Sequence, residues 1–338
     1  MVLIKRFAVS LLFLFICYAA ATQNIAILSR GTKTSLRGLS VVNKQCFWAS
    51  GSYGKVALST DGGKTIKWHT VQGYEKRDFR DIEAFSASTA LIMAVDAPAI
   101  ILKTRDSGYT WQKVFEDTSK GMFLDAMDFK GRNGICIGDP LIDKPYIITT
   151  DNYGESWQKI EEKELPALQK GEAFFASSGT NITLRKNGNG YLFVSGGLTS
   201  SIYNSSNKEL LPLNLQKGKE STGANSIAFY KNKGIIVGGD FARDSLAINN
   251  CVLFHIKKGA INFVTPTKNP TGYKSAVIYL NKNTLLACGT SGVDISVTGG
   301  KEWLNFSRES FHAIQKTPGS NSAYAVGTNG KIAFIQLQ

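Results

Sequence analysis

Thr104-Arg-Asp106-Ser-Gly108-Tyr-Thr-Trp111 is the stretch that decides the fold, because altered copies of it recur along the chain. Ser59-Thr-Asp61-Gly-Gly63-Lys-Thr65 has Ile66 in place of the tryptophan. Thr149-Thr-Asp151-Asn-Tyr-Gly154-Glu-Ser-Trp157 reads as carrying one inserted residue, and Ser296-Val-Thr298-Gly-Gly300-Lys-Glu-Trp303 has threonine in place of the aspartate. Positions 61, 106, 151 and 298 are 45, 45 and 147 residues apart, and 147 is three times 49. A period of roughly 45 residues is that of a propeller blade.

Each copy lies between two strand-like runs and predicts a structural turn. An Asp, Ser or Thr side chain accepts hydrogen bonds from the turn backbone, glycine accepts a positive φ, and tryptophan anchors the next strand. We therefore assign a structural role in the turns, and no catalytic role, to Asp61, Gly63, Asp106, Gly108, Trp111, Asp151, Gly154, Trp157, Gly300 and Trp303.

The whole chain favours an all-β fold. It has 33 Gly, 19 Phe, 12 Tyr and 5 Trp against 8 Pro and 4 Met, a balance typical of strands and turns. The spacing predicts one seven-bladed propeller of four-stranded antiparallel blades, with six or eight blades as alternatives, since blades four and five lack a recognisable turn copy. The predicted innermost strands cover residues 36–41, 80–85, 124–129, 173–177, 225–230, 274–279 and 311–315. The strand at residues 24–28 is expected to complete the last blade and close the ring.

The first 21 residues have the order of a secretory signal peptide. Lys5 and Arg6 precede an apolar run of about a dozen residues, and three alanines follow at 19–21. We expect cleavage before Thr22, a propeller over residues 22–338, and a secreted or periplasmic location. The apolar run is too short for a membrane span, and Ile16 before Cys17 disfavours a lipoprotein signal.

The formal net charge of +13 limits the chemical classes of partner that we expect, but it does not identify a single partner. A basic exported protein suits anionic glycans, lipid headgroups or an acidic partner protein, or simply a surface kept soluble by lysine. The basic residues are scattered singly, which disfavours nucleic-acid binding. Because the sequence has no CxxC pair and only isolated histidines, we expect no bound metal. We also expect no cofactor, and we expect the protein to be a monomer. The disulfide state of Cys46, Cys136, Cys251 and Cys288 stays open.

The recurring turn resembles the Asp box, or BNR repeat, of sialidase-like propellers. The phrases at 78–85, 121–129, 137–140 and 171–182 resemble secreted relatives of the photosystem II stability/assembly factor propellers. This resemblance implies Asp-box turns on the side away from the ligand-binding face. Some such relatives carry the label oxidoreductase, but the sequence has no GxGxxG opening a βαβ unit, no CxxC and no haem-attachment motif.

Propellers bind ligands at the mouth of the central channel, lined by the starts of innermost strands and by the loops between second and third strands. These positions predict a polar ligand site made of Arg80, Asp81, Asp96, Asp125, Asp139, Glu172, Asp240 and Arg243. The main hypothesis is a non-catalytic binding or assembly propeller with a protein or glycan partner at this mouth. The alternative is a glycan-active enzyme, sialidase-like or another hydrolase or lyase, whose candidate catalytic carboxylates are Asp81, Asp125, Asp139 and Glu172. A further alternative involves no ligand. In it Arg80 forms ion pairs with neighbouring carboxylates, and these pairs satisfy the polar groups that line a buried, hydrated channel.

Overall fold

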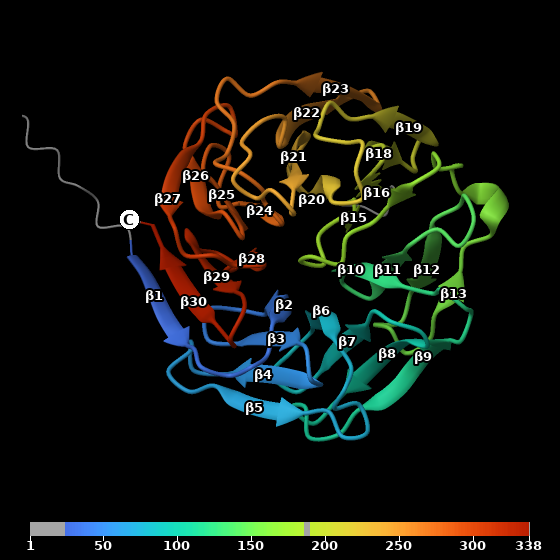
Figure 1. The fold of residues 1–338 in the computed structure, drawn as a ribbon. Helices are drawn as coiled ribbons and strands as arrows, with labels where there is room; N and C mark the ends of the chain where they lie inside the picture. Colours follow the sequence, from blue (N-terminus) through green and yellow to red (C-terminus); the bar gives the residue numbers. More distant parts are fainter. Residues whose placement is uncertain (1–23, 186–189, 338) are drawn as a thin grey trace, which may run out of the picture.

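The computed structural model describes residues 24–185 and 190–337, which form a ring of seven antiparallel sheets around a central channel (Figure 1). The predicted all-β seven-bladed propeller is confirmed. The predicted signal peptide, residues 1–21, lies outside the described residues. The described part has one short 3-10 helix, Glu162–Glu164, and no helix long and apolar enough to cross a membrane.

Each blade runs from an innermost to an outermost strand. Blades 1 to 3 consist of β2 (Leu36–Val41), β3 (Phe47–Gly51), β4 (Lys55–Ser59) and β5 (Lys67–Thr70); β6 (Phe79–Ala84), β7 (Ala90–Ala94), β8 (Ala99–Thr104) and β9 (Gln112–Asp117); and β10 (Leu124–Lys130), β11 (Asn133–Gly138), β12 (Tyr146–Thr150) and β13 (Gln158–Lys159). Blade 4 consists of β15 (Ile182–Leu184), β16 (Tyr191–Val194), β18 (Ser201–Asn204) and β19 (Glu209–Pro212).

The remaining blades follow the same plan. Blades 5 and 6 consist of β20 (Thr222–Tyr230), β21 (Lys233–Asp240), β22 (Cys251–Lys257) and β23 (Ala260–Val264), then β24 (Ala276–Tyr279), β25 (Leu285–Gly289), β26 (Gly292–Ser296) and β27 (Leu304–Ser307). Two short strands, β14 (Glu172–Ala173) and β17 (Gly196–Gly197), extend the sheet of blade 5 beyond β20. Blade 7 consists of β28 (Ala313–Lys316), β29 (Ser322–Val326), β30 (Ile332–Gln336) and β1 (Asn24–Ser29).

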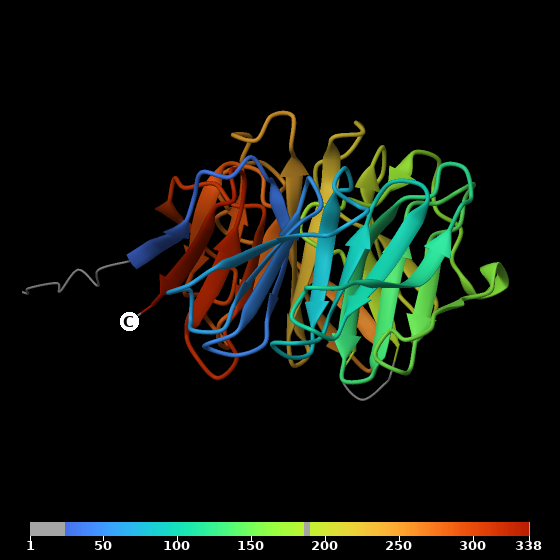
Figure 2. The same cartoon turned by 90° about the horizontal axis from the view of Figure 1, so that it is seen from below.

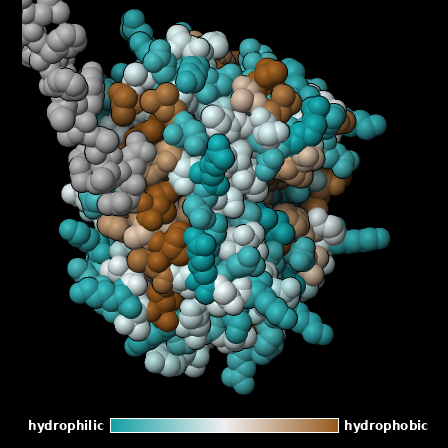
Figure 3. Space-filling view, turned by 60° about the vertical axis from the view of Figure 1, so that its left-hand side comes forward, coloured by the Kyte–Doolittle hydropathy of each residue, from teal (hydrophilic) through white to brown (hydrophobic). Residues whose placement is uncertain are grey.

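The N-terminal strand closes the ring, as predicted. β1 pairs antiparallel with β30, with Ile25 opposite Ile335 and Ile27 opposite Ala333. Strand β1 is therefore the outermost strand of a blade otherwise built from the C-terminus (Figure 1). A band of hydrophobic surface runs down the side of the molecule where β1, β27 and β30 lie (Figure 3).

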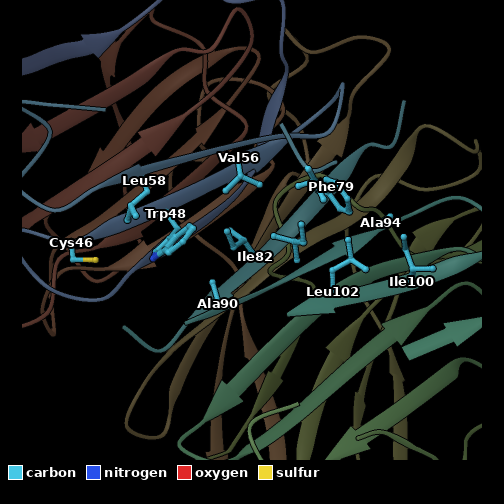
Figure 4. Packing of buried hydrophobic residues seen from close by; sticks show 12 residues of the cluster. Cys46, Trp48, Val56, Leu58, Phe79, Ile82, Ala90, Ala94, Ile100 and Leu102 are labelled. Carbon is cyan, nitrogen blue, oxygen red and sulfur yellow. The ribbon is translucent and has the colours of Figure 1, made fainter. Parts of the chain in front are cut away.

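The core is divided among the interfaces between neighbouring blades. Between blades 1 and 2, Trp48 lies fully buried against Phe79, Ile82 and Leu102 (Figure 4). The indole nitrogen of Trp48 donates to the backbone carbonyl of Ser86 at 2.9 Å, so this large side chain is buried without an unpaired donor. Cys46, Cys136, Cys251 and Cys288 are buried and unpaired in the structure.

The four recurring turns share one hydrogen-bond pattern. In each turn a hydroxyl oxygen accepts the backbone N–H of the glycine four residues later. The hydroxyl and glycine pairs are Ser59 with Gly63 at 2.8 Å, Thr104 with Gly108 at 3.0 Å, Thr150 with Gly154 at 3.1 Å, and Ser296 with Gly300 at 2.9 Å.

A second acceptor corrects the predicted alignment of the third turn. Asp61 and Asp106 accept the N–H of the residue four positions later, Thr65 and Thr110, each at 2.9 Å. In the third turn the residue that does this is Asn152, which accepts from Ser156 at 3.2 Å. The turn therefore holds no inserted residue. The predicted role of Asp151 is wrong, because an amide oxygen serves as acceptor equally well and Asp151 is an exposed neighbour.

These turns join neighbouring blades. A Cβ on Gly108 of blade 2 would lie 3.2 Å from the Trp48 ring of blade 1, and one on Gly300 of blade 6 would lie 2.6 Å from Leu253 of blade 5. A Cβ on Gly154 of blade 3 would collide with Leu91 of blade 2. The glycine thus supplies both the positive φ of the turn and the space for the preceding blade.

The predicted innermost strand at 173–177 is wrong, because β15 takes that place in blade 4. Residues Phe174–Thr180, which we call the channel plug, lie in the central channel instead. The plug contacts other blades through hydrogen bonds from Arg37 of blade 1 to the Ser177 carbonyl, from Ser178 to the Ser275 carbonyl before blade 6, and from Thr180 to Ser226 of blade 5.

Candidate functional site

The channel plug separates two cavities of the central channel. The larger, which we call the mouth cavity, has a volume of about 470 Å³ and is lined by plug residues 174–177. The smaller, of about 110 Å³, is lined by plug residues 178–180. The mouth cavity is lined in part by Asp139, Phe241 and Thr290, which lie on loops that join second to third strands. These loops are at the top of Figure 2. The two ends of the channel therefore present different chemistry.

Four β-bulges aim side chains at the mouth. In β2, β6, β10 and β20 the pairing register slips by one residue near the start of the innermost strand. A bulge leaves one residue outside the ladder and redirects its side chain. The residues left out are Arg37, Arg80, Asp125 and Asn225. Of these residues, Arg37 and Arg80 line the mouth cavity, whereas Asn225 bonds to the lining residues Ser177 and Tyr273, and Asp125 is buried near Arg80.

Two guanidinium groups give the mouth cavity a positive side. Arg80 Nε pairs with the Asp78 carboxylate at 2.8 Å. Arg37 has no ion pair within the described residues, and its one hydrogen bond is to the Ser177 carbonyl at 3.4 Å. Burial and then the charge of Arg80 lower the pKa of Arg37, yet a guanidinium stays protonated in proteins. Arg37 is therefore a cation that forms no ion pair among the described residues, and the carboxylate whose charge acts on it, Asp78, is already paired with Arg80.

His312 lines the same cavity and responds to these charges. Burial, followed by the positive charges of Arg37 and Arg80, lowers its pKa to about 3. Its Nε2 is buried and makes no hydrogen bond in the described structure. At neutral pH His312 is therefore an uncharged imidazole with one free bonding position.

One carboxyl group, that of Asp139, lines the mouth cavity, and a second, that of Asp125, is buried close enough to Arg80 and Asp139 for their charges to affect its pKa. Asp139 accepts the N–H of Phe174 at 2.8 Å, which holds the plug to the loop after β11. Asp125 is completely buried, and neither of its carboxyl oxygens has a hydrogen-bond partner in the described structure. Burial and then the charge of Asp139 raise the pKa of Asp125 well above its usual value, and burial raises that of Asp139.

Aromatic side chains form the rest of the wall. The rings of Phe175 and Phe241 meet edge to face at 5.8 Å, and those of Phe241 and Tyr273 at 6.3 Å. The Tyr273 hydroxyl donates to Asn225 at 2.8 Å, which fixes the ring against the channel. Phe123 and Phe174 complete this apolar side. The mouth cavity can therefore hold an anionic group beside an apolar one.

The structure places Arg80 and Asp139 in the lining of the mouth cavity, buries Asp125 near both of them, and places Asp81, Asp96 and Glu172 elsewhere. Asp81 lies on the far side of the plug and accepts the N–H of Met127 at 2.6 Å. Asp96 is exposed on the loop after β7. Glu172 is buried, where it accepts from Ser195 and from the N–H of Gln169.

Asp240 and Arg243 form a local pair outside the cavity lining. Arg243 Nε lies 3.0 Å from an Asp240 oxygen, while Ser221 and the N–H of Ala242 donate to the other oxygen at 2.8 and 3.0 Å. These bonds satisfy the carboxylate and shape the loop after β21. Their predicted role in ligand binding stays a prediction.

Sequence reasoning missed Arg37, His312, Tyr273, Phe175 and Phe241. A signal for Arg37 was present, because Leu36-Arg37 and Phe79-Arg80 occupy the same place at the start of adjacent innermost strands. The aromatic residues give no comparable signal, because the apolar run that includes Phe175 predicts a buried strand. Within the described residues no group of three or more His, Cys, Asp or Glu is arranged to hold a metal ion.

Comparison with known proteins shows the fold. No family model and no curated protein matches the chain. Among solved structures, YCF48 bound to D1 peptide superposes with a TM-score of 0.66 at 16% identity, covering 95% of this chain and 96% of that one. YCF48 from Cyanidioschyzon merolae gives 0.61 at 15% identity over 94% and 99%. The GH74 xyloglucanase from Xanthomonas campestris gives 0.57 at 15% identity over 92% of this chain and 53% of that one. The predicted resemblance to photosystem II assembly-factor propellers is confirmed at the level of the fold.

Proposed function

We propose that this protein is a non-catalytic, secreted or periplasmic propeller that binds a carboxylate-bearing peptide segment of a partner protein in the mouth cavity. The observation that carries the proposal is Arg37, a partly buried guanidinium that forms no ion pair inside the described chain. Arg80 lies close enough to shift its pKa, so the two cations face the same space. A planar guanidinium matches a carboxylate in geometry as well as in charge.

The other groups of the cavity agree with an anionic ligand. His312 is uncharged at neutral pH, so its free Nε2 can bond to a ligand oxygen once its tautomer places the hydrogen there. The raised pKa of Asp125 favours its neutral form, which lessens repulsion of an entering carboxylate. The aromatic wall of Phe175, Phe241 and Tyr273 suits an apolar side chain beside that carboxylate.

The loops around the mouth favour a protein partner over a small solute. Leu141 and Ile142 are exposed on the loop after β11, and Ile142 is 93% exposed. Leu198, Phe241 and Ile248 are exposed on loops of blades 4 and 5 on the same face. Exposed apolar side chains gathered at one rim are typical of a protein interaction site. YCF48, the neighbour with a D1 peptide bound, supports peptide binding as the class of function.

The glycan-active alternative has less support. Three of its four candidate carboxylates are enclosed, with Asp81 4%, Asp125 0% and Glu172 3% exposed. Glycoside hydrolysis needs two carboxyl groups that both reach the scissile bond. Asp139 is the one candidate of the four that lines the mouth cavity with a partly exposed side chain.

A labelled peptide library with free C-terminal carboxylates and acidic side chains tests the proposal by fluorescence anisotropy. We expect selected peptides to bind, and Arg37→Gln to weaken binding at least about tenfold, since a charged hydrogen bond contributes about 1.5–3 kcal/mol. Arg243→Gln is the matched control, because it removes an exposed guanidinium outside the cavity lining.

Two results would contradict the proposal. The first is a library that yields no binder to wild type under low salt. The second is a set of binders that Arg37→Gln and Arg243→Gln weaken equally, which would indicate attraction to the net charge alone. Glycan cleavage by the wild type that Asp139→Asn abolishes would favour the enzyme alternative instead.

A further inference from the structure

The face opposite the mouth carries a concentration of lysines on blades 5 and 6. Four hairpin turns join β20 to β21, β22 to β23, β24 to β25 and β26 to β27 on this side. Their residues include a single carboxylate, Glu302, next to Lys301 in the last of them. The five other lysines, which we call the lysine face, are Lys231, Lys233, Lys257, Lys258 and Lys282.

The lysine face is not neutralised by the protein itself. None of its five lysines forms an ion pair within residues 24–185 and 190–337. Lys231, Lys257, Lys258 and Lys282 are exposed, and Lys233 is half-buried.

Several comparable turns of other blades contain acids or pair their cations. The turn of blade 2 carries Asp106, and Arg105 beside it pairs with Glu155 of the blade 3 turn. Lys130 at the end of β10 pairs with Asp128 at 2.9 Å. In blade 6 the equivalent of Asp106 is Thr298, which makes the same backbone bond without a charge. Cations that form no ion pair in the described structure also lie on this face at Lys44 and Lys64 of blade 1 and at Arg132 of blade 3, but the lysine face gathers five lysines on two adjacent blades.

Two of these lysines occupy turn positions that favour other residues. Lys231 has φ 59° and Lys258 has φ 50°, in two-residue turns between paired residues Tyr230 and Lys233, and Lys257 and Ala260. Such turns prefer Asn, Asp or Gly, which tolerate the left-handed conformation better. Local turn geometry therefore does not favour lysine at these two positions.

The composition of the lysine face indicates what it binds. Arginine reads single phosphate or sulfate groups through its fork of donors, whereas lysine is a flexible point charge. The four turns of this sector hold six lysines and no arginine, which favours diffuse attraction to a charged layer over recognition of one group. Val297, 60% exposed at the adjacent turn of blade 6, adds an apolar tip suited to a headgroup layer.

We propose that the lysine face docks the propeller onto an anionic lipid bilayer surface. The lysine turns and the mouth loops lie at opposite ends of the ring, the lower and upper ends in Figure 2, so docking leaves the mouth cavity directed away from the bilayer. Near a negatively charged leaflet each lysine strengthens partitioning by a factor of about five. The attraction acts over a Debye length of about 8 Å at physiological salt, so turn tips contribute and residues at the mouth do not.

Vesicle sedimentation tests this proposal with the full mature chain. The probe is a large unilamellar vesicle of phosphatidylcholine with about 30 mol % phosphatidylglycerol at about 50 mM salt, compared with pure phosphatidylcholine. We expect binding to the anionic vesicle only, and a loss of binding when salt rises to about 300 mM. Lys231→Gln/Lys258→Gln/Lys282→Gln is expected to weaken partitioning by about a hundredfold.

The matched control is Lys76→Gln/Lys120→Gln/Lys170→Gln, which removes three exposed, unpaired lysines from connections on the mouth side. The control is expected to bind vesicles as wild type does, and circular dichroism checks that both variants are folded. Equal weakening by both triple variants would overturn the proposal, because net charge would then explain binding. Absence of vesicle binding with strong, lysine-dependent heparin binding would overturn it in favour of a glycan partner.

Discussion

At the scale of single residues, Asp125 is the most unusual side chain of the mouth. It is fully enclosed, its two oxygens are unpartnered, and burial raises its pKa well above the value in an unfolded chain. The folded protein therefore binds a proton at pH values where the unfolded chain has released it. Linkage then requires that the contribution of Asp125 to stability falls as pH rises through the folded pKa.

Asp125→Asn tests this sign, since the amide has the shape of the protonated acid and does not ionise. At pH 4 we expect the variant and wild type to melt at nearly the same temperature. At pH 8 we expect the variant to melt about 2–4 °C higher, because wild type must either take up a proton from solution or bury a charge on folding, and the amide does neither. Differential scanning calorimetry at both pH values measures the effect. A variant that melts lower at pH 8 would show that Asp125 is ionised and stabilised by Arg80.

At the scale of elements, the recurring turn is a joint between blades. Its hydroxyl and its amide or carboxylate acceptor each take one backbone N–H, and its glycine lies against the preceding blade. Trp111 and Trp303 donate from their indole nitrogens to the carbonyls of Gly108 and Gly300 at 3.1 and 3.0 Å. A substitution that removes one of these turn contacts is therefore expected to lower the free energy of unfolding of the whole propeller.

A pair of neighbouring substitutions distinguishes the two alignments of the third turn. Asn152→Ala removes the oxygen that accepts the N–H of Ser156, so we expect a loss of about 1 kcal/mol in the free energy of unfolding. Asp151→Ala removes an exposed side chain and is expected to change it by less than about 0.5 kcal/mol. Urea denaturation of both variants gives the comparison. A larger loss for Asp151→Ala would restore the alignment with an inserted residue.

The channel plug makes a second prediction at this scale. Gly179 has φ 68°, and a Cβ there would collide with the carboxylate of Asp81. We expect Gly179→Ala to lower the melting temperature by about 4 °C or more and to weaken peptide binding, because the plug forms one wall of the mouth cavity.

Gly121→Ala provides the control for the plug variant. Gly121 has φ 82° with nothing within 4 Å of the added Cβ, so this variant bears the backbone strain alone. Equal effects of the two substitutions on melting and binding would mean that the plug yields freely, and the assigned wall would be wrong.

Sequence reasoning predicted strands well and the plug badly for one physical reason. Strands such as β7 and β25 are short buried apolar runs bounded by turn residues, and this local pattern determines them. Phe174-Phe175-Ala176 shows the same local pattern, but the hydrogen bonds that hold the plug come from blades 1, 5 and 6, far away in sequence. Arg80 and Asp139 were predictable from their positions in a blade, whereas the missing counter-ion of Arg37 depends on the closed ring.

At the scale of the whole molecule, closure by β1 links the two ends of the chain. Ile25 and Ile27 pack against the cluster that includes Ile314, Ile335 and Phe306. Without β1 this cluster would be opened and the edge of β30 would be free to pair with another molecule.

Two truncated forms test closure, one beginning at Asn24 and one at Arg30. We expect the first to melt and elute as a chain that begins at Thr22 does. The second is expected to melt at least about 5 °C lower and to form oligomers on size-exclusion chromatography, because it exposes an apolar strand edge. A monomeric second form with unchanged melting would mean that β1 is dispensable and that three strands suffice for blade 7.

The channel plug also determines how a ligand enters and leaves the central channel. Because residues 174–180 cross the middle of the channel, the mouth cavity is open at the mouth and is separated by the plug from the small cavity on its other side. A ligand in the mouth cavity therefore enters and leaves through the same opening. A partner protein that covers this opening would therefore slow the dissociation of the ligand. The residence time of the ligand would then depend on contacts at the rim, made by Ile142 and its neighbours, as well as on the groups that bind the ligand inside the cavity.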